Sequence, residues 1–119
     1  MMDPRREFGN EGENLAATFL EQKGYQILER QYRCSFGEID LICRLGDEVV
    51  FVEVKSRHTH EYGYPEESVT ATKRRHLLSV SEEYLESHHL CESPWRVDVI
   101  AIEFDQDPAK ISHFEAIDV

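Results

Sequence analysis

The sequence has no long apolar run and few cysteines, and both features narrow the class of protein. None of its apolar stretches approaches the ~20 residues that a helix needs to span a bilayer. The N-terminal stretch MMDPRREFGNEGEN lacks the apolar core of a signal peptide. The three cysteines (Cys34, Cys43 and Cys91) form no C-x-x-C pair, which argues against a disulfide framework. We therefore expect a soluble, cytoplasmic protein with no membrane partner, whose cysteines are free thiols, mostly buried.

Positive charge is also scarce. The chain has 13 Lys and Arg residues against 24 Asp and Glu residues, a formal net charge of −11. This balance argues against a large electrostatic grip on nucleic acid. The bases are nevertheless unevenly spread, because TKRRH places Lys73, Arg74 and Arg75 side by side, and Lys55 and Arg57 follow an apolar segment. The pattern is compatible with a local basic lip on an acidic body, and it does not support a broad basic surface.

The 119 residues have the length of a single domain, residues 1–119, with no repeats, linkers or low-complexity segments. A helix is predicted at residues 10–24, with Asn10 as N-cap, Glu13 closing a capping box and Gly24 as terminator. The other predicted elements are strands at residues 25–33, 38–45 and 48–56, a helix at 69–88, a strand at 95–103 and a final edge strand at 109–117. This α-β-β-β-α-β order, with one more strand at the end, predicts an α/β fold whose mixed sheet is flanked by helices.

Gly46 and Asp47 form a two-residue hairpin signal between two of these strands. Folding the chain about them places Asp40 opposite Glu53 and Glu38 opposite Lys55. Strand alternation then predicts one wholly apolar face, while the other face becomes charged toward the open end of the hairpin. The residues expected on the apolar face are Ile39, Leu41, Cys43, Val50, Val52 and Val54.

The predicted Asp40–Glu53 pair opposes two like charges, which destabilises a sheet. Three explanations stay open: the strands emerge into solvent, Lys55 and Arg57 neutralise the acids, or a divalent cation such as Mg²⁺ or Mn²⁺ sits between the carboxylates. The E-x-K spacing favours the cation, because it puts Glu53 and Lys55 on one face beside Asp40. Phosphodiester hydrolysis uses such parts: a metal that activates water, and a cation that stabilises the developing charge.

The two motifs, GEID and FVEVK, with their flanking helices, resemble the PD-(D/E)xK nucleases of the restriction-endonuclease-like fold, whose core order is αβββαβ. The chain looks most similar to the YraN-like family of small bacterial proteins, predicted endonucleases related to archaeal Holliday-junction resolvases. The stretches that carry this resemblance run from about Gly12 to Ile100; they are GENLAATFLEQKGYQIL, GEIDLI, VFVEVKSR, TKRRHL and RVDVI. Ile39 precedes the first acid where the superfamily motif has proline, which is common in this branch.

The resemblance implies an Mg²⁺- or Mn²⁺-dependent endonuclease acting on DNA, including branched or structured DNA. Asp40 and Glu53 would be metal ligands, together with the backbone carbonyl of Val54. Lys55 would position or activate the water, and Glu13 would complete the acidic site. Resolvases of this type act as dimers because a junction has twofold symmetry, so a homodimer through the last strand or its edge is one expectation here. The rival hypothesis is a nuclease-fold module that binds nucleic acid or a protein partner and cuts nothing.

Several side chains have both a structural and a functional interpretation. Glu13 either closes the capping box or joins the site, and Glu38 either pairs with Lys55 or supports the site. Lys73 lies in the i, i+4 series with Val69 and Leu77, so it either reaches the rim of the sheet or, as we favour, contacts the substrate phosphates with Arg57.

Asp98 and a group of histidines have other expected roles. Asp98, inside an apolar strand, is expected to pair with Arg96 or another neighbour. A zinc site among the histidines and Cys91 is disfavoured, because their spacing is not that of a closed four-ligand site. The histidines concerned are His58, His60, His88 and His89.

Overall fold

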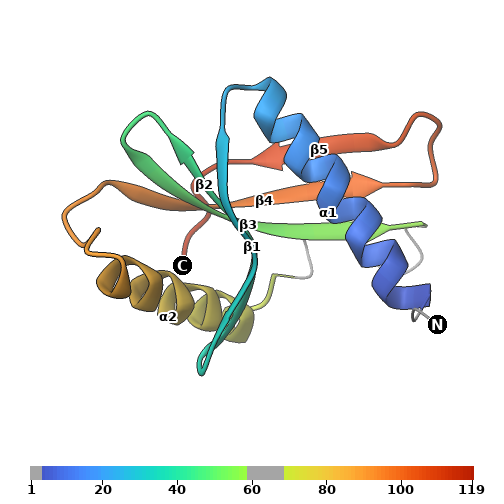
Figure 1. Ribbon diagram of the computed structural model, residues 1–119. Coiled ribbons are helices and arrows are strands. Elements are labelled where there is room, and N and C mark those ends of the chain that lie inside the picture. Colours follow the sequence, from blue (N-terminus) through green and yellow to red (C-terminus); the bar gives the residue numbers. More distant parts are fainter. Residues whose placement is uncertain (1–3, 59–68) are drawn as a thin grey trace.

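The computed structural model describes residues 4–58 and 69–119, and of residues 4–9 the backbone only. Five strands form one sheet in the order β1-β2-β3-β4-β5, in which β3 and β4 are parallel and the other neighbours antiparallel (Figure 1). The predicted αβββαβ core with an added final strand is therefore confirmed. The elements are α1 (Pro4–Gln22), β1 (Gln26–Cys34), β2 (Gly37–Leu45), β3 (Glu48–Arg57), α2 (Ala71–Ser87), β4 (Trp95–Glu103) and β5 (Lys110–Phe114).

The two helices cover opposite faces of the sheet (Figure 1). Alternation along β3 shows this division, because Val50 and Val52 pack in the cluster under α1 while Phe51 packs in the cluster under α2. Burial on both faces explains why β3 and β4 are apolar at nearly every position. The helix residues in the two clusters are Ala16, Ala17 and Leu20 of α1, and Leu77, Val80, Tyr84 and Leu85 of α2.

Helix α1 begins six residues before the predicted N-cap. Pro4 is its first residue, a position that suits the fixed φ of proline. Asn10 therefore lies inside the helix, and the predicted capping box with Glu13 is wrong. The side-chain oxygen of Asn10 instead accepts a hydrogen bond from Gln31 at 3.1 Å. The expected terminator is confirmed: Gly24 has φ 92, and its N–H donates to the Glu21 carbonyl at 3.0 Å.

The β2–β3 hairpin has the predicted register about Gly46 and Asp47, from Leu45–Glu48 to Leu41–Val52. The described pairing ends there, so the predicted Asp40–Glu53 and Glu38–Lys55 pairs are wrong as cross-strand pairs. Glu38 instead pairs with Arg33 on β1, at 2.8 Å.

The β1–β2 hairpin changes face at Asp40. Leu41 packs under α1, but Ile39 packs in the α2 cluster, so the prediction that both share one face is wrong. Tyr32, which pairs with Ile39, also packs on α2, with its ring 5.1 Å from that of Tyr84. The end of the hairpin therefore turns away from β3 toward α2 (Figure 1), which leaves an opening between β2 and β3.

The cysteines, the lengths of the helices and strand β5 can also be compared with the sequence-based predictions. All three cysteines are free, as expected, but Cys43 is buried, Cys34 is partly buried and Cys91 is exposed. No helix in the described parts of the chain is long and apolar enough to cross a bilayer. Strand β5 forms one edge of the sheet, as predicted.

Candidate active site

The backbone of Val54 meets the side chain of Asp40 where β2 and β3 separate. The Val54 N–H donates to Asp40 Oδ2 at 2.7 Å, which replaces a bond from the neighbouring strand. In an antiparallel sheet the N–H and C=O of one residue point to the same side of their strand. The Val54 carbonyl therefore faces the same opening as the Asp40 carboxylate, so two oxygen donors of different kinds border one gap.

Asp40 lies in an acidic, poorly solvated position. Burial and the nearby charge of Glu53 raise the pKa of its carboxyl to about 7, and Glu13 adds to this effect. The hydrogen bond from Val54 and the charge of Lys55 oppose the rise without cancelling it. The protein thus gathers negative charge at Asp40 that its own donors do not fully compensate.

Two lysines converge on Glu53, whose residue is only 5% exposed. The Nζ atoms of Lys55 and Lys73 lie 3.3 Å and 3.1 Å from the same oxygen, Glu53 Oε1. Burial disfavours the charged form of Lys73, yet the charge and hydrogen bond of Glu53 raise the pKa of that amine overall. Lys73 belongs to the first turn of α2, where its N–H donates to the N-cap hydroxyl of Thr70 at 3.2 Å. Lys73 therefore contacts Glu53 directly, and its role toward substrate phosphates stays a prediction.

Glu13 of α1 is buried on the other side of Asp40. Arg30 Nε contacts its Oε1 at 3.1 Å, and Gln31 Nε2 donates to its Oε2 at 3.0 Å. Gly12 makes this approach of α1 feasible, because a Cβ at that position would lie 2.2 Å from Ser56 Oγ on β3. The adjacent Gly12 and Glu13 therefore act together: the first lets the helix come close, and the second presents its carboxylate.

A polar cavity of about 270 Å³ lies between α1 and the separating strands. It joins Glu13, Asp40 and Val54 in one space, whereas Glu53 and its lysines lie on the α2 side of the sheet. Arg57 follows on β3 and shares the face of Glu53 and Lys55 by strand alternation. The residues that line the cavity are Asn10, Glu13, Gln31, Arg33, Glu38, Asp40, Val54 and Ser56.

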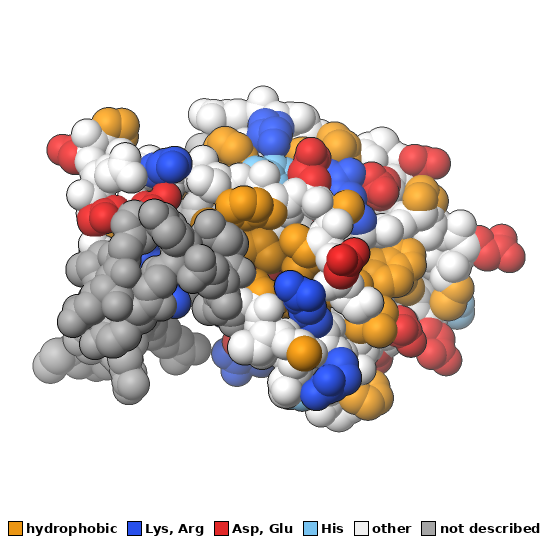
Figure 2. All heavy atoms as spheres, turned by 180° about the vertical axis from the view of Figure 1, so that it is seen from behind, with side chains coloured by type: hydrophobic (Ala, Val, Ile, Leu, Met, Phe, Trp, Pro, Cys, Tyr) orange, Lys and Arg blue, Asp and Glu red, His pale blue; other side chains and the backbone are white. Residues whose placement is uncertain are grey.

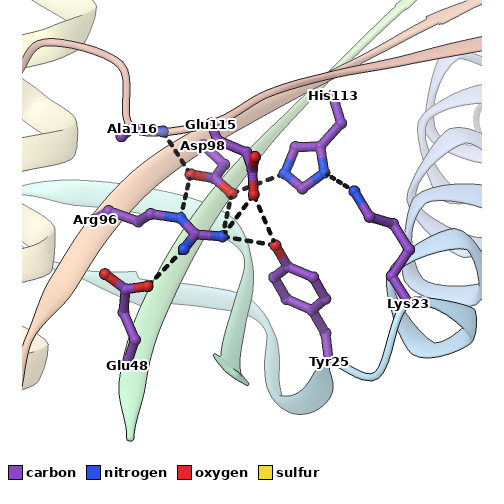
Figure 3. Close-up of polar contacts among 8 residues, drawn as sticks. All are labelled: Lys23, Tyr25, Glu48, Arg96, Asp98, His113, Glu115 and Ala116. Carbon is purple, nitrogen blue, oxygen red and sulfur yellow. Dashed lines mark hydrogen bonds and ion pairs between the residues drawn. The ribbon is translucent and has the colours of Figure 1, made fainter. Parts of the chain in front are cut away.

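A second polar cluster surrounds Asp98, which is fully buried in β4 (Figure 3). Its carboxylate accepts hydrogen bonds from Arg96 Nε at 3.0 Å, His113 Nε2 at 2.7 Å and the Ala116 N–H at 2.9 Å. Burial alone would raise the pKa of Asp98, but these bonds and the Arg96 charge lower it instead. The expected pairing of Asp98 with Arg96 is confirmed.

This second cluster has the spacing of a metal site but not its electrostatics. Three possible ligand atoms lie within 4.8 Å of one another, one each from Asp98, His113 and Glu115. However, Arg96 Nη2 contacts Glu115 at 3.1 Å and Asp98 at 3.3 Å, so a guanidinium already holds both carboxylates. Lys23 Nζ lies 2.7 Å from His113 Nδ1, and an ammonium only donates, so Nε2 carries the ring proton that Asp98 accepts. A cation would have to displace all of these donors.

The disfavoured zinc group is not assembled in the described parts of the chain. His88 stacks on Tyr84, with 3.9 Å between the ring centroids, and its Nδ1 lies 3.0 Å from the Tyr84 carbonyl. His88, His89 and Cys91 do not bring three ligand atoms together as the Asp98 cluster does. His60 lies outside the described residues.

Comparison with known proteins adds the family. The model of the uncharacterised protein family UPF0102 matches residues 12–102. The chain belongs to this family. The match spans the GEID and FVEVK motifs, α2 and the part of α1 from Gly12 onward, and it confirms the resemblance to the YraN-like branch of the restriction-endonuclease-like superfamily.

Curated relatives support this assignment over most of their length. A UPF0102 protein of Caldicellulosiruptor saccharolyticus is 44% identical over 98 residues, which are 82% of this chain and 83% of the relative. Another, of Pelotomaculum thermopropionicum, is 42% identical over 117 residues, 97% of this chain and 98% of the relative. A third, of Anaeromyxobacter dehalogenans, is 40% identical and covers 96% of this chain and 85% of its own.

Among solved structures, that of Pyrococcus furiosus SfsA in complex with Ca²⁺ shows a distant likeness. Its sequence identity is 14% and its TM-score 0.42, covering 100% of this chain and 67% of the other. A likeness at this level carries no argument for this UPF0102 protein, whose candidate site rests on its own geometry.

Two residues at the contact between α1 and the sheet, Gly12 and Gln31, were not predicted from the sequence to have a functional role. The sequence carries one signal for Gly12, because a glycine inside a helix is unfavourable unless another segment must approach it closely. The sequence carries no such signal for Gln31, because a glutamine in a strand-like segment is common. Both act through α1, whose distance from the sheet no periodicity records.

Proposed function

We propose that this protein is a metal-dependent endonuclease that hydrolyses phosphodiester bonds in DNA, with branched or otherwise structured DNA among its substrates. The observation that carries the proposal is the opening at Asp40. There an aspartate with a raised pKa and the Val54 backbone meet, with Glu53, Lys55 and Lys73 beside them. The resemblance of the GEID and FVEVK motifs to those of the PD-(D/E)xK nucleases supports the same class of activity.

The residues at the opening fit a hard divalent cation. Asp40, Glu53 and the Val54 carbonyl offer oxygen only, which Mg²⁺ and Mn²⁺ prefer, and Mg²⁺ needs just one or two carboxylates beside waters. The negative charge at Asp40 is what a cation would relieve, whereas Glu53 already pairs with Lys55 and Lys73, which would have to share it with the ion. When bound, such an ion supplies charge neutralisation for the phosphate and a more acidic water.

The basic side chains have separate parts in this proposal. Lys55, on the same face as Glu53, orients the attacking water and stabilises the negative charge that develops on the phosphate. Lys73 and Arg57 bind the substrate phosphates. Glu13, held by Arg30 and Gln31, completes the acidic site from the α1 side.

A second candidate, a non-catalytic binding module, is favoured by the charge distribution. Near the site each of Arg30, Arg33, Lys55 and Lys73 is paired with a carboxylate. Among the described residues on the face shown in Figure 2, Lys and Arg side chains are scattered among acidic and apolar ones and form no continuous basic track. With a net charge of −11, a long DNA footprint is hard to build. This candidate predicts binding without turnover that Lys55 barely affects.

A cleavage assay separates the two candidates. Purified protein is incubated with four-way junction, flap and single-stranded DNA in Mg²⁺, Mn²⁺ or EDTA. We expect cleavage that needs the cation and falls at least about 100-fold in Asp40→Asn, Glu53→Gln and Lys55→Met, the scale of losing one group that stabilises transition-state charge.

Matched controls come from the same structure. Asp47→Asn removes an exposed acid at the other end of the β2–β3 hairpin, and Lys110→Met removes an exposed lysine of β5; both should cleave like the wild type. Cleavage that survives both Glu53→Gln and Lys55→Met would belong to a contaminant and would end the proposal. DNA binding without cleavage in every cation would favour the binding module.

A further inference from the structure

Gln31 has a backbone conformation that glutamine rarely adopts. It lies within β1, yet its φ is 52, in the left-handed region. Residues other than glycine, asparagine, aspartate and histidine are uncommon there, because Cβ crowds the following carbonyl. Such strain persists only where the surroundings enforce it, and it gathers at functional sites. The position of Gln31 therefore needs a cause.

The strained residue stands across the sheet from Asp40. The β1–β2 pairing runs from Arg30–Leu41 to Tyr32–Ile39, and the place between these pairs is that of Gln31 and Asp40. Both strands change face at this point, since Leu41 packs under α1 while Ile39 and Tyr32 pack in the α2 cluster. The left-handed residue and the candidate ligand thus share one kink.

The kink turns the Gln31 side chain onto α1. In an extended strand, consecutive side chains point to opposite faces, so Gln31 should point away from the helix that Arg30 reaches. Instead Gln31 Nε2 donates to Asn10 Oδ1 at 3.1 Å and to Glu13 Oε2 at 3.0 Å, while Arg30 holds Glu13 Oε1. Two successive residues of β1 therefore hold the same turn of α1, which only an irregular backbone allows.

The choice of side chain indicates what the strain achieves. Glycine would adopt this φ without strain but has no amide, and asparagine tolerates it but is one methylene shorter. Glutamine is poorly suited to the backbone and well suited to reach Glu13. Gln31 also lines the cavity beside Glu13 and Asp40.

We propose that Gln31 is a positioning residue of the candidate active site, whose left-handed backbone directs its amide onto α1 and fixes the Glu13 carboxylate at the cavity opposite Asp40. This inference rests on the proposed function, because that function gives the site its role. The hydrogen bond from Gln31 to Glu13 does not depend on catalysis. It acts through Glu13 and requires no contact between Gln31 and substrate.

The test combines unfolding without metal and Mn²⁺ affinity by calorimetry. Gln31→Gly should melt about 2–5 °C above Gln31→Ala, because both variants lose the amide bonds to Asn10 and Glu13 and only glycine relieves the left-handed strain. It should also weaken Mn²⁺ binding by about tenfold or more, the usual effect of losing a residue that orients a site group. Gln31→Asn should keep part of the affinity. Gln26→Gly, the same change at an exposed regular position of β1, should lower the melting temperature and leave Mn²⁺ affinity unchanged.

A double-mutant cycle with Glu13→Gln tests whether Gln31 acts through Glu13. In that background Gln31→Gly should change Mn²⁺ affinity by less than about twofold, since the carboxylate that it positions is already gone. An equal loss in both backgrounds, no loss in either, or a Gln31→Gly variant that melts no higher than Gln31→Ala would overturn the inference.

The outcomes also separate this inference from the proposed function. If Gln31 and Glu13 are coupled in Mn²⁺ binding but the protein cleaves no DNA, the inference holds and the endonuclease proposal fails. Cation-dependent cleavage with no Gln31 effect on Mn²⁺ affinity would remove the inference alone. A wild type that binds no Mn²⁺ would remove both.

Discussion

Asp40 and Asp98 are two aspartates in apolar strands of the same sheet, and their surroundings are opposite. Asp98 accepts from a guanidinium, an imidazole and a backbone N–H, and its pKa is lowered despite burial. Asp40 accepts the Val54 N–H but faces the charge of Glu53, and its pKa is raised to about 7. One carboxylate is satisfied by the protein, and the other is left with unrelieved negative charge.

This difference separates a structural cluster from a candidate functional one. The Asp98 cluster joins β4, the C-terminal tail and the segment between α1 and β1 in one network, as Figure 3 shows for Tyr25, Arg96 and Glu115. Its geometry is complete without any ligand. The arrangement at Asp40 costs stability, and proteins tolerate such local costs chiefly at sites of function.

Asp98→Asn should produce the largest loss of stability. It removes the charge that Arg96 and His113 contact and leaves a partly buried guanidinium less compensated, an effect of about 3–5 kcal/mol for buried ion pairs. Urea unfolding followed by circular dichroism measures the loss. If Asp98→Asn lost less than about 1 kcal/mol, the network would not be the structural cluster that we infer.

Gly12→Ala should destabilise the protein by about 1–2 kcal/mol, because its Cβ would meet Ser56 Oγ at 2.2 Å. This clash outweighs the gain in helix propensity, about 1 kcal/mol. The cycle with Ser56→Ala sharpens the test, since the hydroxyl is then absent and Gly12→Ala should become stabilising. A clash that Ser56→Ala fails to relieve would place the cause elsewhere.

Asp40→Asn should have the opposite sign to Asp98→Asn. Without divalent cations at pH 8, it should raise the free energy of unfolding by on the order of 1 kcal/mol, because an amide keeps the acceptor for Val54 and removes the repulsion with Glu53. Denaturant unfolding in EDTA provides the measurement. A loss as large as that of Asp98→Asn would show that both aspartates are structural.

The pH dependence should also differ in sign between the two sites, by less than about 1.4 kcal/mol per pH unit. A raised pKa means that the folded state binds more protons, so the Asp40 contribution is present near pH 4 and is lost as pH rises toward 7. The lowered pKa of Asp98 gives a contribution that is present above about pH 4 and is lost as pH falls below it. Unfolding of the wild type and the two Asn variants in EDTA between pH 3 and 8 isolates each term. Parallel slopes would contradict the comparison.

Much of the fold could be predicted because local patterns dominate it. The Gly46–Asp47 turn and the alternating residues around it fix the register from Leu45 to Leu41. The apolar run at residues 95–103 identifies β4 with its observed ends. For the site, strand alternation alone puts Glu53 and Lys55 on one face, where the structure has them in contact.

The remaining features depend on tertiary contacts that no sequence period records. The face change between Ile39 and Leu41 is invisible, because their spacing is that of a regular strand. Asn10 does not cap the helix, because α1 extends back to Pro4 and the Asn10 side chain accepts a hydrogen bond from Gln31 instead. The lysine of α2 that reaches Glu53 was foreseen by helical spacing, but its convergence with Lys55 on one oxygen was not.

The parallel pairing of β3 with β4 also has a consequence for folding kinetics. The β1–β2, β2–β3 and β4–β5 pairs close over short turns, whereas β3 and β4 meet only after the chain from Arg57 to Trp95 has been brought round with α2. The entropy of closing that long segment must be met before its contacts contribute, which makes this step slow relative to the hairpins. Glu53 and Lys55 arrive with the early hairpin, and Lys73 arrives with the late crossover. The Lys73–Glu53 ion pair therefore belongs to the last stage of folding, whereas the Lys55–Glu53 pair forms within β3, before the lysine of α2 arrives.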